Sequence, residues 1–108
     1  MKIDLAREFS TVPSGRYYSD GPDSGERFRE EYLRPAISEP GPIEIRIDGT
    51  AGFGSSFLEE AFGGAVRLGY IDAATFLSRL KLVYDDEEFA MYEDLIKLFI
   101  NDARSENL

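Results

Sequence analysis

Residues 43–66 combine a strand pattern, a glycine-rich turn and a helix pattern without interruption. Isoleucines at positions 43, 45 and 47 alternate with charged side chains, which predicts a strand with one buried and one polar face. Glycines at positions 49, 52 and 54 mark the turn. Apolar side chains then recur at the spacing of an amphipathic helix, at Phe57, Leu58, Ala61, Phe62, Ala65 and Val66. A strand that passes through a tight turn into a helix restricts the chain to an α/β fold.

The turn delivers two adjacent serines, Ser55 and Ser56, to the start of the helix. Free backbone N–H groups and the positive end of the helix dipole meet there, so an anion or a phosphate is stabilised. Two interpretations remain open. The serines either only cap the helix, with Ser55 or its predecessor as the N-cap residue, or form a phosphorylation or anion-binding site. Phe53 in the turn either stands exposed as a protein contact or folds back into the core.

The remaining chain supplies further strands and helices in the order β-β-α-β-α-α-β-α. The strand at residues 43–48 is connected to the strand at 80–84 through helices, which favours parallel pairing of the two. A hairpin between the first two strands would make the sheet mixed. The predicted fold is therefore a single α/β domain over residues 1–108, with a small mixed β-sheet and helices mainly on one face. Strands are expected at residues 2–6, 16–18, 43–48 and 80–84, and helices at residues 25–37, 55–68, 73–79 and 87–103.

The composition excludes several classes of function. The 108 residues contain neither histidine nor cysteine, which removes Ser-His-Asp catalysis, zinc sites and thiol chemistry. A net charge of −9 argues against binding to nucleic acid or to an anionic membrane surface. No apolar window of about 18 residues predicts a transmembrane helix, and the first residues lack the apolar segment of a signal peptide. We therefore expect a cytoplasmic protein without metal or cofactor.

The remaining polar and glycine-rich groups are explained by structural roles. No lysine follows the turn glycines, so no P-loop is predicted. Gly63 and Gly64 lie inside a predicted helix, where glycine is unfavourable, and they predict close packing against a neighbouring element. Glu59 and Glu60 flank the apolar stripe and are expected to be solvated. Three arginines of the first half, Arg16, Arg27 and Arg29, either pair with acidic side chains or face a phosphate, and we expect surface ion pairs.

Two runs of sequence carry a wider pattern, SGRYYSDGPDSGERFREEYLRPAI and IDGTAGFGSSFLEEAFGGAVRLG. Both resemble the STAS-like domain family of unknown function, whose hallmark is a strand followed by a G-S-S-F-L-(D/E)-E-A-F-G-G run. That family is similar in turn to the STAS domains of anti-sigma factor antagonists. In those domains a partner ATPase of the histidine-kinase-like fold phosphorylates a serine of a D-S-S-G run. By position, Ser55 and Ser56 match the two serines, whereas Gly54 and Phe57 stand where the aspartate and the glycine would be.

The resemblance implies a non-enzymatic regulatory domain that works in a partner switch with a histidine-kinase-like ATPase. Ser55 is the first candidate for phosphorylation and Ser56 the second. Two other classes remain open: a self-assembling structural subunit whose glycine-containing helix packs against another copy, and a sensor that holds a small anion or nucleotide at residues 49–56. The residues expected to bind the partner or anion beside the serines are Gly52, Phe53, Gly54, Phe57 and Leu58.

Overall fold

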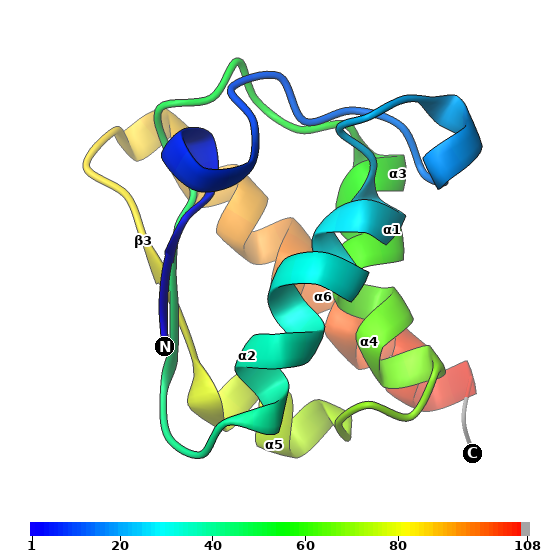
Figure 1. Ribbon diagram of the computed structural model, residues 1–108. Helices are drawn as coiled ribbons and strands as arrows, with labels where there is room; N and C mark the ends of the chain where they lie inside the picture. The colour runs from blue at the N-terminus through cyan, green and yellow to red at the C-terminus, as the bar shows by residue number, and fades with distance from the viewer. Residues whose placement is uncertain (107–108) are drawn as a thin grey trace.

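The computed structural model describes residues 1–106, with side chains through Ala103. It contains a three-stranded parallel sheet in the order β1 (Lys2–Asp4), β2 (Ile43–Arg46) and β3 (Leu80–Val83). Ile3 pairs with Ile45, and Ile45 pairs with Leu82, so one row of apolar side chains crosses the sheet. The predicted parallel pairing between the strands at 43–48 and 80–84 is confirmed. The helices gather on one side of the sheet (Figure 1).

The prediction of a mixed sheet with a strand at residues 16–18 is wrong. These residues enter a 3₁₀ turn at Tyr18–Asp20, and all three strands of the sheet are parallel. The cause is local: the carboxylate Oδ2 of Asp20 accepts hydrogen bonds from the backbone N–H groups of Arg16, at 3.1 Å, and Tyr17, at 2.8 Å. An acidic side chain that satisfies nearby backbone donors in this way competes with strand pairing.

The chain contains two long helical runs, one before and one after β2, and each contains a π-helical turn. The first helical run corresponds to the helix predicted at 25–37, and Ser24 caps it by accepting a hydrogen bond from Arg27 N–H at 3.2 Å. The first run consists of α1 (Gly25–Phe28), the turn Arg29–Leu33 and α2 (Arg34–Ser38). The second consists of α3 (Ser55–Leu58), the turn Glu59–Gly63 and α4 (Gly64–Arg67). Shorter turns at Leu5–Phe9 and Glu87–Phe89 and the helices α5 (Ala73–Arg79) and α6 (Ala90–Glu106) complete the described chain.

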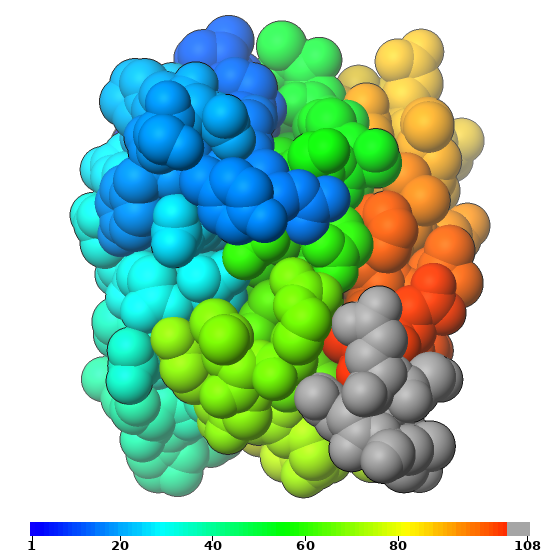
Figure 2. Space-filling model, turned by 90° about the vertical axis from the view of Figure 1, so that its right-hand side faces the viewer, coloured from blue at the N-terminus to red at the C-terminus, as the bar shows by residue number. Residues whose placement is uncertain are grey.

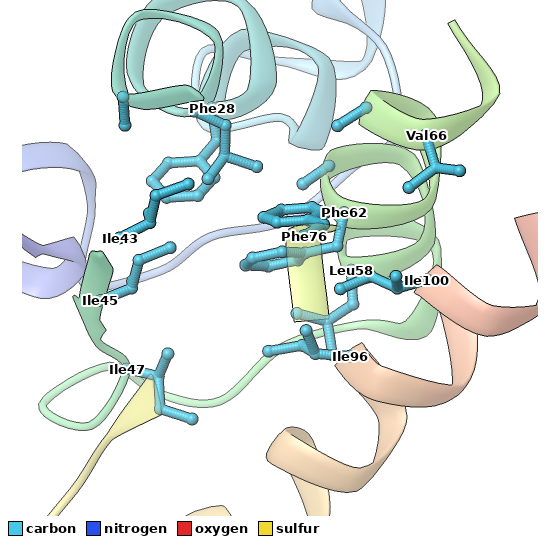
Figure 3. Packing of buried hydrophobic residues seen from close by; sticks show 14 of the residues in the cluster. Phe28, Ile43, Ile45, Ile47, Leu58, Phe62, Val66, Phe76, Ile96 and Ile100 are labelled. Atoms are coloured by element: carbon cyan, nitrogen blue, oxygen red, sulfur yellow. The ribbon is translucent and has the colours of Figure 1, made fainter. Parts of the chain in front are cut away.

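The core lies between the sheet and these helices. Ile43, Ile45 and Ile47 are fully buried and point toward a layer of phenylalanines from the helices (Figure 3). Phe62 stacks on Phe76 with the ring centroids 6.2 Å apart. The opposite face of the sheet carries charged side chains, such as Lys81, whose side chain is 70% exposed. The alternation along β2 thus decides which face the helices cover. No helix in the described part of the chain is long and apolar enough to span a bilayer.

Candidate functional site

The turn between β2 and α3 is held by two glycine conformations, by the Thr50 hydroxyl and by a hydrogen bond to Thr11. Gly49 and Gly52 have φ angles of 88° and 105°, in the left-handed region that favours glycine. The hydroxyl of Thr50 accepts a hydrogen bond from Gly52 N–H at 3.2 Å, and Ala51 N–H donates to the carbonyl of Thr11 at 2.8 Å. The chain therefore approaches the helix along one defined path.

Ser55 and Ser56 are the first two residues of the second helical run. Gly54, the predecessor of Ser55, is the N-cap residue, and no side chain caps the helix. The interpretation in which the Ser55 hydroxyl itself caps the helix is therefore wrong. Both serines are exposed, and within the part of the chain whose side chains are described neither hydroxyl makes a hydrogen bond. Their hydroxyl groups are thus free to react or to contact a partner.

The other residues expected around the serines divide into two groups. Phe57 and Leu58 are fully buried, so they support the turn from beneath. Phe53 is half-buried and folds back against the core, with ring-centroid distances of 5.7 Å to Phe57 and 5.2 Å to Tyr92. The exposed surface at this place therefore includes Gly54, Ser55 and Ser56, while the aromatic side chains pack into the core.

A buried ion pair joins the two helical runs below the turn. The side chain of Arg29 donates through Nη1 to Glu60 Oε2 at 2.5 Å and to the Glu60 carbonyl at 3.0 Å. Arg29 is 3% exposed and Glu60 is 7% exposed. Burial alone would lower the pKa of Arg29, but hydrogen bonds to Glu30 and Glu60 hold the pKa above its ordinary value. Both members of the pair lie in π-helical turns, a rare feature that is frequent at functional sites.

A second layer of charges surrounds this pair. Arg16 donates through Nη1 to Glu59 Oε1 and, at 3.1 Å, to Glu60 Oε1. Arg67 reaches the same two carboxylates from the other side, through Nη1 to Glu59 and Nη2 to Glu60. Burial alone would raise the pKa of Glu59, but hydrogen bonds from Arg67 and Arg16 outweigh it and hold the pKa below its ordinary value.

This charge network corrects two expectations. Glu60 is buried and Glu59 is partly covered, so they are not solvated side chains beside the apolar stripe. Arg29 forms a buried pair instead of a surface one, whereas Arg27 does pair at the surface, with Glu31 at 3.2 Å. The sequence feature that could have indicated this buried pair is the pair of adjacent helix glycines, because Gly64 leaves space for the Arg29 side chain.

The glycine pair inside the second run faces the protein's own elements. A Cβ on Gly63 would lie 3.3 Å from the carbonyl oxygen of Phe99 in α6, and a Cβ on Gly64 would lie 2.7 Å from Arg29 Nη1. The predicted close packing is confirmed. The chain itself therefore covers the glycine pair, and Gly63 and Gly64 are both buried.

An open recess lies beside the charge network. It has a volume of about 500 Å³ and is found on the face seen in Figure 2, where the blue, green and orange segments meet. Its walls bring together residues from the segment before α1, the second helical run and α6: Arg16, Tyr17, Glu59, Glu60, Arg67, Phe99 and Asp102. Arg16 and Arg67 are paired with Glu59 and Glu60 along its floor, and Asp102 adds a further carboxylate to the wall.

A smaller recess of about 360 Å³ lies at the carboxyl ends of β1 and β2. Ligands of open parallel sheets bind at this end of the strands. Two arginines line it: Arg46 pairs with Asp48 at 3.1 Å, whereas the guanidinium of Arg7 forms no ion pair with a described residue. Within the described residues, no group of three or more acidic side chains is arranged to hold a metal ion.

A known family model matches the part of the chain that contains the strand-to-helix turn and the buried ion pair. The model of the STAS-like domain of unknown function (DUF4325) matches residues 24–88. The match begins at the cap of α1 and includes the strand-to-helix turn and both members of the Arg29–Glu60 pair. No curated protein and no solved structure is significantly similar to the chain. Because the matched region spans more than half of the 108 residues, the chain belongs to the family of STAS-like domains of unknown function.

Proposed function

We propose that this protein is a regulatory, protein-binding domain that is switched by phosphorylation at Ser55 or Ser56. The observation that carries the proposal is the state of these two serines: both are exposed and their hydroxyls have no partner among the described side chains. A kinase needs such access to the hydroxyl oxygen. The partner class is a histidine-kinase-like ATPase, as in the STAS domains that the family resembles.

Phosphorylation at this place would change the surface and leave the fold in place. A phosphoserine adds about 1.5 to 2 negative charges at neutral pH. The start of a helical run tolerates that charge through the helix dipole, and both serines are exposed whereas Phe57 and Leu58 are buried. The switch therefore acts on a bound partner, by repulsion or by attraction.

The side chains argue against catalysis by this domain. The chain has no histidine or cysteine, and the most deeply buried carboxylate, Glu60, is held by Arg29. A carboxylate that is 7% exposed and bonded to two arginines serves the packing of the two helical runs. We therefore propose a binding role without an enzymatic one.

The test is affinity capture of the protein from its native cells, with modified residues mapped by mass spectrometry. Ser55→Ala and Ser56→Ala are compared with Ser78→Ala, which removes an exposed serine on α5 as a control. We expect phosphate on Ser55 or Ser56, and an ATPase partner whose recovery changes only in the matching variant. Unmodified protein, together with unchanged partner recovery in Ser55→Asp and Ser56→Asp, would refute the proposal.

A second candidate function is the sensing of a small anion, and the smaller recess favours it. Arg7 offers a guanidinium without an ion pair among the described residues, at the end of the strands where ligands of parallel sheets bind. Inorganic phosphate and nucleotides should then raise the melting temperature of the wild type and leave that of Arg7→Gln unchanged. An identical melting curve with and without these anions removes this candidate.

A further inference from the structure

We infer that Arg16 is the receptor for a phosphate on Ser56, and that it moves from Glu59 and Glu60 to the phosphate when Ser56 is modified. The inference rests on the proposed function, since it requires a phosphoserine in the turn. It adds the identity of the modified serine and the first event after modification. It also explains why a charged cluster stands directly behind the turn.

The helix spacing selects Ser56 over Ser55. Glu59 and Glu60 follow Ser56 by three and four residues, so all three side chains lie on one side of the second helical run, about 5 to 6 Å apart at their Cβ atoms. Arg16 Nη1 bonds to both carboxylates and therefore lies on that same side. The corresponding neighbours of Ser55 are Glu59 and the buried Leu58, so only one of them belongs to the charge network.

The network can release Arg16 without leaving a carboxylate unpaired. Glu59 keeps its contact with Arg67, and Glu60 keeps the 2.5 Å contact between Arg29 Nη1 and its Oε2. The loss of a partner is costly when it leaves a buried charge uncompensated, and that situation does not arise here. Arg29 cannot take the same role, because it is 3% exposed and also bonds to the Glu60 carbonyl.

Arg16 also has spare donors that suit a phosphate. Its hydrogen bonds to described residues run through Nη1 alone, so Nε and Nη2 have no acceptor there. The side chain is 30% exposed, which leaves it room to turn. A guanidinium binds phosphate through two parallel N–H donors, and such charge-assisted bonds are stronger than neutral ones.

The movement would carry the signal to a second surface. The backbone of Arg16 is tied on both sides: its N–H donates to Asp20 Oδ2 at 3.1 Å, and its carbonyl accepts from Glu26 N–H at 2.9 Å. The next residues, Tyr17 and Tyr18, are 50% and 47% exposed. Movement of Arg16 from the two carboxylates to the phosphate therefore shifts the point at which the two-tyrosine segment is held, from Glu59 and Glu60 to the start of α3.

The experiment uses purified full-length protein with phosphoserine incorporated at position 56, and at position 55 as the matched control. The second pKa of the phosphate is measured by ³¹P NMR titration. We expect the pKa of the phosphate at position 56 to lie about half a unit lower in the wild type than in Arg16→Gln, because a nearby cation favours the dianion. The phosphate at position 55 should respond less. The rate of hydrogen exchange at residues 16–20 should change on phosphorylation of Ser56, because Arg16 then holds this segment at a different place.

Two further comparisons keep the result decisive. Circular dichroism verifies the fold of Arg16→Gln. Arg16→Lys retains the charge without the paired donors, so the pKa of the phosphate at position 56 should lie between its values in the wild type and in Arg16→Gln. If Arg16→Gln does not fold, the comparison between phosphoserine 56 and phosphoserine 55 in the wild type decides. Equal phosphate pKa values and unchanged exchange would overturn this inference and leave the proposed function standing. A clear shift in a protein that is never phosphorylated in its cells would refute the proposed function alone.

Discussion

The Cβ that Gly64 lacks would lie 2.7 Å from Nη1 of Arg29 and 3.3 Å from its Cδ. The guanidinium therefore occupies the place where any other residue at position 64 would put its side chain. From there Arg29 reaches Glu60, one turn earlier in the same run. The position of the Arg29 guanidinium between the two helical runs thus depends on the absence of a methyl group at residue 64.

Gly64→Ala should destabilise the protein although alanine is the better helix former. The new methyl group must displace the Arg29 side chain, and overpacking of this kind costs about 1–3 kcal/mol. Urea unfolding followed by circular dichroism measures the loss. The matched control is Gly64→Ala combined with Arg29→Ala, which removes the obstructing atoms. If Gly64→Ala is as stable as the wild type, the Arg29 side chain has another place to go, and the packing argument fails.

Replacement of either member of the buried pair should be costly, and joint replacement less so. Glu60→Leu leaves the buried Arg29 with Glu30, a longer contact to Glu26 and the backbone carbonyl of residue 60, and we expect a loss of about 3 kcal/mol. Arg29→Met together with Glu60→Leu removes both charges and should recover part of that loss. A double-mutant cycle from urea unfolding gives the coupling free energy. If the double variant loses as much free energy of unfolding as the two single variants together, the two side chains are not coupled.

Gly52→Ala should distort the turn that presents the serines. Gly52 has a φ of 105°, and a Cβ there would lie 2.5 Å from Oη of Tyr92. Gly69→Ala is the matched control, because Gly69 has a φ of 80° with nothing within 4 Å of its missing Cβ. We expect Gly52→Ala to lose about 1 kcal/mol more free energy of unfolding than the control, since it adds a steric clash to the same backbone strain. Equal losses would mean that the Tyr92 contact is unimportant.

The free energy of unfolding should fall in acid because Glu59 becomes protonated. Hydrogen bonds from Arg67 and Arg16 overcome burial and hold its folded-state pKa below the ordinary value of 4.5. A depressed pKa contributes stability fully above the unfolded value, and that contribution disappears as the pH falls through the folded-state pKa. The free energy of unfolding should therefore begin to drop near pH 4.5 and continue below it. Glu59→Gln should flatten this part of the curve, whereas the exposed Glu88→Gln should not; an unchanged slope in Glu59→Gln would contradict the assignment.

Local patterns predicted a large part of this fold correctly. Alternation identified β2, the helix period identified the second helical run, and the helical crossover predicted the parallel pairing of β2 with β3. The two quoted sequence runs led to the family that the match at 24–88 supports. These features could be read from the sequence because each one depends on residues close together in the chain.

Local patterns failed where a side chain satisfied the backbone or where distant charges met. Asp20 bonds to the N–H groups that the predicted second strand would have used. Periodicity classes Arg29 and Glu60 as solvent-facing because they are charged, but they are 31 residues apart and neutralise each other in the core.

By itself the sequence determined the family, the strand-to-helix turn and the two serines at its end, since glycine spacing and hydrophobic period are local properties. The tertiary structure decided that Gly54 is the cap, that Phe53 folds inward and that Arg16, Arg29 and Arg67 surround Glu59 and Glu60. The physical reason is that a residue's type sets what it can bind, whereas long-range packing sets which partner comes within reach.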